Sequence, residues 1–412
     1  MTPSVDLAAF LSALSPHAGV AVVRDGDAFV VGTEPSDVVL ANGDAAFAAF
    51  DRAERGGFWA GFVSYELGRG VEHVAARTVD DLGVPDVVLA RYDARVVFSR
   101  DRVPRVEGDS TAARRALEQA LWRATRRTAH TRVTPVRGAW HSSLTRAEHA
   151  ERVHTIKDLL AAGECYQVNL TRRLTSQSRV DPLALFATVY QQHPAPHAAL
   201  LTLSDAGAGV DVVSASPELF LRTRGRNVET RPIKGTARDA ARLRSSAKDR
   251  AENVMIVDLA RNDLGRVCVP GSVHVPALCA LEQHPGLHHL VSTVAGRRRE
   301  DVTLGALMRA TFPPASVTGA PKPRVMQIIE DLETVRRGVY CGAIGWVDGD
   351  RDTSAWSVAI RTFQITRHAM HFGTGGGIVA DSDAASEWDE TELKARRLLD
   401  LVPVTTSARR AQ

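Results

Sequence analysis

The stretch Arg231–Thr236, RPIKGT, is the part of the sequence on which the interpretation of fold and function both depend. It places Lys234 between two residues with opposite backbone properties. Pro232 fixes φ, whereas Gly235 lets the backbone approach a ligand closely. Thr236 adds a hydroxyl and a backbone N–H, which suit an oxygen-rich ligand. Because lysine usually stays in solvent, this arrangement indicates a functional lysine only if other motifs accompany it.

Four further motifs accompany the stretch. They are Ser214–Phe220 (SASPELF), Asp249–Asp263 (DRAENVMIVDLARND), Ser316–Lys322 (SVTGAPK) and Gly375–Glu390, which contains a GGG run and EWDE. In this order the set resembles the motifs of the chorismate-utilising enzymes, and the resemblance covers residues 140–402. Five separated motifs agree, which makes the resemblance specific.

The lysine at position 234 resembles the residue found at this position in one branch of that family, the aminodeoxychorismate synthases. The matching subunit is component I, also called the large subunit of para-aminobenzoate synthase. In the related anthranilate synthase component I this position is usually alanine. The resemblance implies conversion of chorismate and ammonia to 4-amino-4-deoxychorismate, for folate or for an aromatic secondary metabolite. Two alternatives remain, anthranilate synthase component I and a non-catalytic regulatory subunit of the same fold. Identification of the product distinguishes the first alternative from an aminodeoxychorismate synthase. An assay of chorismate consumption distinguishes the second alternative from an enzyme.

The composition limits the class of protein. The chain has 412 residues, of which 44% are hydrophobic and 24% charged, as is usual for a soluble globular protein of one large or two smaller domains. A net charge of +3 with scattered arginines does not favour binding to nucleic acid. No apolar run approaches the ~20 residues that span a bilayer, and the N-terminus lacks the pattern of a secretory signal. Four well-separated cysteines indicate reduced thiols. We therefore expect a cytoplasmic protein without membrane or nucleic-acid partners.

Local patterns predict an α+β fold. Thr145–Glu148 is a capping box that begins a helix, and a strand follows at Tyr166–Leu170. Further strands are predicted at 340–347, 354–366 and 370–374, ahead of a final helix at 386–401. The resemblance implies a two-subdomain β-sandwich with surrounding helices, similar to anthranilate synthase component I. The expected division is an N-terminal subdomain at 1–135 and a chorismate-binding catalytic subdomain at 140–405.

Two pairs of carboxylates suggest a magnesium site. Asp249 and Glu252 lie three residues apart on one predicted helix, as do Glu387 and Glu390 on another, so each pair shares a helix face. A solvated acidic face is the alternative for either pair alone. Mg²⁺ binds one or two carboxylates together with waters and substrate oxygens. The resemblance implies that Glu252 and Glu390 bind the metal, with Asp249 and Glu387 supporting its waters, and that the ion holds the ring carboxylate of chorismate.

The resemblance also implies a set of substrate contacts. The glycine run, which follows the strand predicted at 370–374, would bind the enolpyruvyl carboxylate together with Arg361 and Tyr340. A plain turn at the end of that strand is the alternative. Arg361 is predicted within the hydrophobic strand at 354–366, where a guanidinium needs a carboxylate partner. The implied substrate-binding residues are Gln167, Gly235, Thr236, Ser316, Tyr340, Arg361, Gly375, Gly376, Gly377 and Lys394.

Three residues are implied for catalysis, namely Lys234, Glu218 and His289. Glu218 would act as a general acid for the C4 hydroxyl, which leaves poorly unless protonated. Lys234 would attack C2 of chorismate, and ammonia would then attack C4. A lysine with a pKa near ~10.4 is only ~0.04% neutral at pH 7, so this role requires a lowered pKa. His289 matches the family's active-site histidine, although a core histidine is the alternative.

Two further features of the sequence limit which reaction of the family we expect and where its ammonia comes from. Gln167 lies where relatives that add water to chorismate carry a lysine base, and glutamine cannot deprotonate water, which disfavours an isochorismate or salicylate product. The sequence contains no Gly-x-Cys-x-Gly nucleophile motif. The resemblance therefore implies a separate glutamine amidotransferase subunit that delivers ammonia within a heterodimer. A Leu-Glu-Ser element, which forms the tryptophan pocket of anthranilate synthases, is not found, so feedback by tryptophan is not expected.

Overall fold

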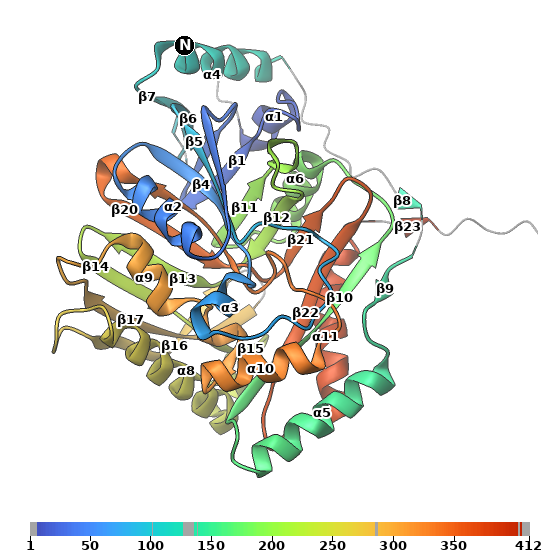
Figure 1. Cartoon of the computed structure of the whole chain (residues 1–412). Coiled ribbons are helices and arrows are strands. Elements are labelled where there is room, and N and C mark those ends of the chain that lie inside the picture. Colours follow the sequence, from blue (N-terminus) through green and yellow to red (C-terminus); the bar gives the residue numbers. More distant parts are fainter. Residues whose placement is uncertain are drawn as a thin grey trace, which may run out of the picture.

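The computed structural model describes residues 6–100, 102–126, 136–137, 139–284, 287–402 and 404–405. Two antiparallel sheets dominate these residues (Figure 1). Sheet I has eleven strands in the order β18 (Gly319–Ala320), β10 (Gln167–Ser176), β22 (Met370–Ile378), β21 (Thr362–Ile365), β12 (Asp211–Ser216), β11 (His197–Leu201), β1 (Ala21–Asp25), β2 (Ala28–Gly32), β6 (Ala94–Phe98) and β7 (Arg105–Gly108), with β9 (His141–Ser142) beside β10. Sheet II has ten strands in the order β15 (Ile233–Ala237), β17 (Leu287–Arg297), β14 (Asn227–Arg231), β13 (Leu219–Arg224), β20 (Thr353–Val358), β19 (Ala343–Asp348), β4 (Phe58–Val63), β5 (Val87–Tyr92) and β3 (Asp37–Ala41), with β16 (His274–His284) beside β17. A separate parallel pair joins β8 (Val136–Arg137) and β23 (Val404–Thr405).

The two sheets pack face to face, and helices cover their outer faces. Strand alternation shows this arrangement in β4, where Phe58 and Phe62 join a buried cluster that also contains Ala21 and Val23 of β1. Trp59 points to the other face of β4 and packs in the cluster formed with the helices of sheet II. The predicted α+β sandwich with surrounding helices is thus confirmed.

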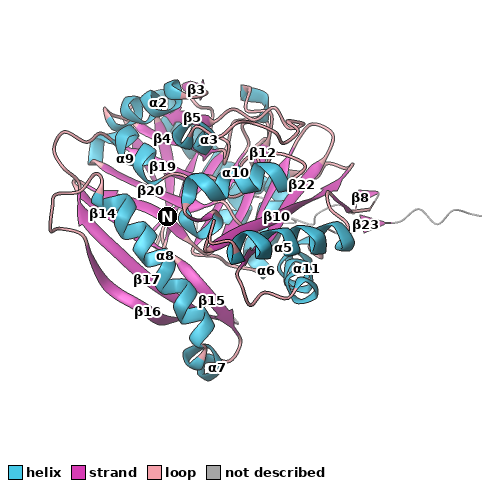
Figure 2. Ribbon diagram, turned by 60° about the horizontal axis from the view of Figure 1, so that its bottom comes forward, coloured by secondary structure: helices cyan, strands magenta, loops and turns pink. Residues whose placement is uncertain are grey.

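The helices fall into groups according to the face that they cover. Sheet I packs against α1 (Leu7–Ser12), α4 (Thr111–Ala124), α6 (Pro182–Gln192) and α11 (Ala384–Leu399). Sheet II packs against α2 (Asp44–Glu54), α8 (Ala247–Gly265) and α9 (Leu304–Thr311). The remaining helices are α3 (Leu67–Glu72), α5 (Arg146–Ala161), α7 (Ala240–Ser245) and α10 (Lys322–Leu332), and the 3₁₀ turns are η1 (Ser204–Ala206), η2 (Ala315–Val317) and η3 (Gly349–Arg351). Figure 2 shows α8 lying along the β15–β17 end of sheet II.

The N-terminal strands are built into both sheets. β1 pairs with β11 in sheet I, and β4 pairs with β19 in sheet II. The predicted boundary near residue 135 lies outside the described residues. The division into subdomains at 1–135 and 140–405 therefore stays a prediction.

Several local predictions are confirmed and one is wrong. Thr145 and Glu148 form the capping box of α5, and the last helix, α11, begins two residues earlier than predicted. The single strand predicted at 354–366 is wrong, because β20 belongs to sheet II and β21 to sheet I. The chain crosses between the sheets around Arg361, whose φ is 53°. Both halves of the segment are buried, so the hydrophobic pattern does not reveal the break.

Two predictions that rested on composition also have structural counterparts. None of the described helices has both the length and the apolar character that a membrane crossing needs. Cys165, Cys268, Cys279 and Cys341 are all buried and free. Burial agrees with the prediction that these thiols are not paired in disulfides.

Candidate active site

Lys234 lies in an irregular part of sheet II. β15 and β17 pair antiparallel, but their register shifts between Ile233 and Thr236. Lys234 and Gly235 therefore form a β-bulge, a distortion that redirects a side chain and is common beside active sites. Gly235 has a φ of 83°, which glycine adopts readily, and a Cβ at this position would lie 2.9 Å from the Cβ of Asp249. The glycine lets α8 pack directly against the bulge that carries the lysine.

The surroundings of Lys234 alter its acidity. The residue is half-buried and interacts electrostatically with Glu252, Glu218, Lys394 and Glu390. Burial lowers the pKa of the Lys234 ammonium, while the Glu252 and Glu218 carboxylates oppose the shift. A lowered pKa increases the neutral fraction, which is the form that a nucleophilic amine needs.

Glu218 is the buried acid of the site. It follows Pro217 in the turn between β12 and β13 and is 4% exposed. Burial raises the pKa of Glu218 to about 7, although a hydrogen bond from Ser316 and the charge of Lys234 act in the opposite direction. Close to half of the Glu218 side chains therefore carry a proton near neutral pH. This is the state that general-acid catalysis requires.

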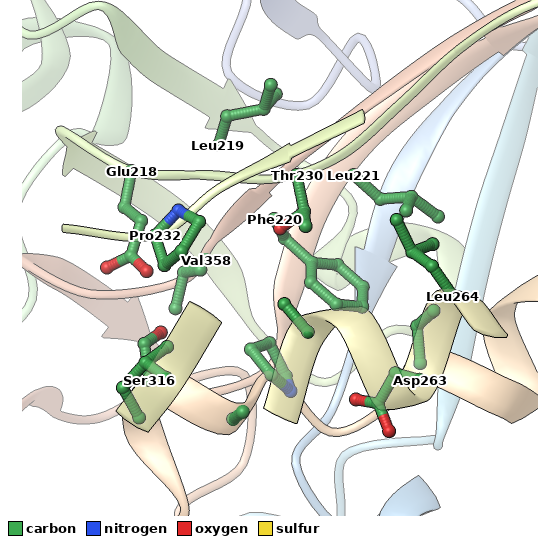
Figure 3. Close-up of a pocket in the computed structure, with 15 residues that line it drawn as sticks. Glu218, Leu219, Phe220, Leu221, Thr230, Pro232, Asp263, Leu264, Ser316 and Val358 are labelled. Carbon is green, nitrogen blue, oxygen red and sulfur yellow. The ribbon is translucent and has the colours of Figure 1, made fainter. Parts of the chain in front are cut away.

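A cavity adjoins Glu218. It is partly open to solvent and is lined mainly by apolar residues of β13, α8 and the η2 region. Figure 3 shows Glu218, Pro232 and Ser316 at one end of the cavity and Asp263 at the opposite end. Asp263 is paired there with Lys322 at 2.9 Å. Glu218 thus stands between the apolar cavity and the charged group around Lys234.

His289 lies on β17 opposite the bulge. It is 2% exposed, and its Nδ1 lies 2.8 Å from Oγ1 of Thr236, its partner residue across the strands. The hydrogen bond ties the histidine ring to the strand that carries Lys234. The structure thus brings His289 into the same part of sheet II as Lys234 and Thr236.

The four predicted carboxylates lie on α8 and α11. Ser246 caps α8 by accepting a hydrogen bond from the N–H of Asp249, and Nε2 of Gln167 lies 3.4 Å from Oε2 of Glu252. On α11, Oγ of Ser382 donates to Glu387 at 2.6 Å. Glu390 pairs with Lys394 at 2.7 Å.

Electrostatic interactions connect the two helices. The charge of Lys234 interacts with the carboxylates of Glu252 and Glu390. The charge of Lys248, which lies on α8, interacts with Glu387 and Glu390 of α11. Burial and the neighbouring Glu390 charge raise the pKa of Glu387. Burial opposes the fall in the pKa of Glu390, but Lys394 and Lys248 lower it overall. One carboxylate of each helix, Glu252 of α8 and Glu390 of α11, therefore lies near Lys234.

The donor set suits Mg²⁺. Every candidate ligand offers oxygen, and like charges that crowd together would be relieved by a cation. Within the described residues, no group of three or more His, Cys, Asp or Glu side chains forms a ready metal site. A site completed by waters and substrate oxygens is the kind that Mg²⁺ typically occupies.

The glycine run is part of a regular strand, so the strand predicted at 370–374 is longer than predicted and the alternative of a plain turn does not apply. Residues 375–377 lie within β22 and pair with Asn169, Leu170 and Thr171 of β10. A Cβ at Gly377 would lie 2.4 Å from Nε2 of Gln167. Glycines commonly end strands, but here they allow close approach within the sheet.

Arg361 lies between strands, which corrects its predicted position within one. Its φ of 53° falls at the crossover from β20 to β21. Burial lowers the pKa of Arg361, as does the nearby Arg397, while Glu218 opposes the shift. Among the described residues, the ion pairs found do not include Arg361. A half-buried guanidinium in this setting is suited to a substrate carboxylate.

Tyr340 lies in a second, polar cavity. This small cavity is also lined by Thr171, Glu333, Arg337 and Gly373. A Cβ at Gly373 would lie 2.2 Å from the Tyr340 ring, so the two residues are in contact. Burial raises the pKa of Tyr340. Its predicted contact with substrate stays a prediction, because its described neighbours belong to this second cavity.

The structure adds residues that the sequence analysis did not name as part of the site. Ser382 donates a hydrogen bond to Glu387. Lys248 of α8 interacts electrostatically with the carboxylates of α11, and Arg397 lies near Arg361. Ser382 precedes the helix cap Asp383, and this run of polar residues could have marked it. Lys248 and Arg397 look like ordinary surface charges in sequence, so nothing local distinguishes them.

Comparisons with known proteins show the family to which the sequence belongs. A family model described as chorismate binding enzyme matches residues 25–400. Aminodeoxychorismate synthase component 1 of Klebsiella aerogenes is 41% identical over 354 residues, which cover 82% of this chain and 76% of that protein. Anthranilate synthase component 1 of Streptomyces coelicolor is 36% identical over 381 residues, which cover 85% of this chain and 73% of that protein.

Solved structures show the same architecture. The crystal structure of anthranilate synthase component I from Streptococcus pneumoniae superposes with a TM-score of 0.79 and 26% identity, covering 91% of this chain and 92% of the other. The menaquinone-specific isochorismate synthase MenF of Escherichia coli has a TM-score of 0.75 at 17% identity, with coverage of 98% and 92%. At that identity the second likeness concerns the fold alone.

Proposed function

The chain belongs to the family of chorismate binding enzymes, and from this membership we propose that it is an aminodeoxychorismate synthase component I. It converts chorismate and ammonia to 4-amino-4-deoxychorismate. The observation that carries the proposal is the position of Lys234 in a bulge beside Glu218, with burial lowering the pKa of the lysine and raising that of the acid. The proposal is also supported by the aminodeoxychorismate synthase relatives.

The first half of the reaction uses Lys234 and Glu218. The electron pair of neutral Lys234 Nζ forms a bond to C2 of chorismate, and the two ring double bonds shift towards C4. The C4 hydroxyl then leaves as water with the proton of Glu218. The lysine supplies one electron pair and the departing water takes one, so the ring undergoes no net oxidation or reduction.

The second half reverses these shifts. Ammonia attacks C4, the double bonds return to their original places, and Lys234 leaves C2 with its electron pair. Glu218, now a carboxylate, accepts a proton from the incoming nitrogen and is ready for the next cycle. His289, hydrogen bonded to Thr236, completes the proposed catalytic group.

The remaining residues bind and orient the substrate. The backbone of the glycine run and the guanidinium of Arg361 hold the enolpyruvyl carboxylate, while Gln167, Ser316 and Lys394 border the ring. Glu252 and Glu390 would hold Mg²⁺, with Asp249 and Glu387 supporting its waters, and the ion would supply positive charge to the ring carboxylate.

The proposal is tested by product analysis. Purified protein is incubated with chorismate, ammonium and Mg²⁺, and the product is identified by mass spectrometry. We expect 4-amino-4-deoxychorismate, and we expect glutamine to replace ammonium only after addition of a glutamine amidotransferase subunit. Release of pyruvate with anthranilate would assign the other branch, and absence of chorismate consumption would leave a regulatory subunit. Efficient use of glutamine by the isolated chain would refute the separate partner.

A further inference from the structure

A buried amide lies directly beside one of the candidate metal ligands. Asn253 follows Glu252 on α8 and is 0% exposed. Its Nδ2 donates to the carbonyl oxygen of Leu290 at 3.1 Å, and its Oδ1 accepts a short hydrogen bond from the Ser292 hydroxyl. Both polar ends of the amide are therefore engaged by β17. A buried amide is costly unless it is satisfied in this way.

Ser292 connects this amide to strand β16 and to the segment between β14 and β15. Its Oγ accepts a hydrogen bond of 2.8 Å from the N–H of Cys279, which lies in an irregular part of β16 with a φ of 50°. A bulged residue lacks a regular ladder partner, and Ser292 satisfies its N–H. The N–H of Ser292 donates to the carbonyl oxygen of Pro232 at 3.1 Å. One residue thus contacts α8, β16 and the segment that leads to Lys234.

We propose that Asn253, Ser292 and Cys279, together called the Asn253 junction, position α8 so that its carboxylates face the Lys234 bulge. The junction meets each functional segment close to its reactive residue. Asn253 is adjacent to Glu252, and Ser292 bonds to Pro232, two residues before Lys234. This inference rests on the proposed function, because it assumes that the carboxylates of α8 act with Lys234.

The packing of α8 leaves little room for it to move. The gap at Gly235 is so narrow that even a methyl group would lie 2.9 Å from Asp249 Cβ. Apolar packing would hold the helix against the sheet but would not define its rotation as sharply, because hydrogen bonds depend on direction as well as distance. Residues that support ligands in this manner typically alter metal affinity or activity by about 10- to 100-fold when changed.

Two variants test the junction. Asn253→Leu removes both ends of the amide at similar volume, and Ser292→Ala removes only the hydroxyl, which is the milder change if the first variant folds poorly. We expect the Mg²⁺ concentration for half-maximal activity to rise about tenfold in Asn253→Leu and less in Ser292→Ala. We also expect faster hydrogen exchange in residues 247–256 of the metal-free protein, since α8 loses its tie to β17.

A matched control separates positioning from general destabilisation. Thr223 of β13 and Ser354 of β20 form a hydrogen bond of 2.8 Å between two buried hydroxyls of the same sheet. Thr223→Val should lower the thermal unfolding temperature while leaving Mg²⁺ dependence and exchange in α8 as in the wild type.

The outcomes discriminate between the two proposals. If both junction variants keep wild-type exchange in α8, or move Mg²⁺ dependence no more than Thr223→Val, the junction is only structural and the inference is wrong. If the wild-type protein does not aminate chorismate, the proposed function fails. Exchange in α8 and calorimetric titration with Mg²⁺ then still decide whether the junction positions this helix.

Discussion

The two sheets contribute different chemical groups to the candidate site. Sheet II supplies Lys234 and His289, and the turn that enters it from β12 supplies Glu218, so all three titratable residues lie beside a bulge or turn. Sheet I supplies the amide of Gln167 and the regular backbone of the glycine run. The comparison teaches that reactive side chains lie where the backbone is irregular, whereas the proposed binding surface is a closely packed strand. Changes in sheet II should therefore affect the rate of chemistry, and changes in sheet I should affect substrate binding.

The largest effect is expected from Lys234→Ala. Wild-type protein with chorismate but no ammonia should show an adduct one dehydrated chorismate heavier, and peptide mapping should place it on Lys234. The variant should lose this adduct and most formation of the 4-amino product, by about a thousandfold or more. Weak direct amination at C2 would be retained, since Arg361 and Glu218 still activate the substrate. Formation of the 4-amino product at near wild-type rate would show that the lysine only binds.

The second-largest effect is expected from Glu218→Gln. Its kcat should fall by about 10²- to 10⁴-fold, because an amide cannot donate the proton. In the wild type, kcat/KM should fall as pH rises above about 7, since the pKa of Glu218 is about 7 and the acid must be protonated. If kcat/KM of Glu218→Gln still fell above pH 7 as in the wild type, a group other than Glu218 would cause that fall.

The same residue allows a test of stability. A carboxyl whose pKa rises on folding binds its proton more tightly in the folded state, so the stability that this proton contributes is fully present below pH 4.5 and is lost as pH rises through about 7. A rise from 4.5 to about 7 corresponds to about 3 kcal/mol at most. Glu218→Gln should therefore unfold at a higher temperature than wild type at pH 8, and the difference should vanish near pH 4.

Substitutions of the candidate metal ligands on α8 and α11 test the proposed magnesium site. Glu252→Gln and Glu390→Gln should each reduce Mg²⁺-dependent turnover by about a hundredfold or more. Their effects on the metal-free fold should be small, because Glu390 is half-exposed and its pair with Lys394 is a surface one. Activity measured against Mg²⁺ concentration checks this, and wild-type metal dependence in either variant would eliminate that residue as a ligand.

The smallest effect is expected in sheet I. Gly377→Ala places a Cβ 2.4 Å from Nε2 of Gln167 and should raise the KM for chorismate about tenfold with a smaller change in kcat. Gly376→Ala is the matched control, because its nearest contact would be 3.2 Å, to Oε2 of Glu387. Equal effects in both variants would show that the strand, rather than the Gln167 side, limits substitution.

Much of the site could be predicted because its signals are local. The capping box at Thr145 and the i,i+3 spacing of Glu387 and Glu390 depend on residues within one turn. The end of the last strand at residue 374 and the position of Arg361 within a strand were predicted wrongly for the opposite reason. Whether three glycines turn or pair, and whether a buried segment stays in one sheet, depends on strands far away in sequence.

By itself, the sequence determined the chemical groups and the elements that carry them, since capping, periodicity and backbone preference act over a few residues. Only the tertiary structure decided that Lys234 occupies a bulge, that β20 and β21 belong to different sheets, and that Asn253 ties α8 to β17. It also decided the directions in which the pKa values of Lys234 and Glu218 shift. The physical reason is that register, burial and the electrostatic surroundings of a charge arise from residues brought together by folding.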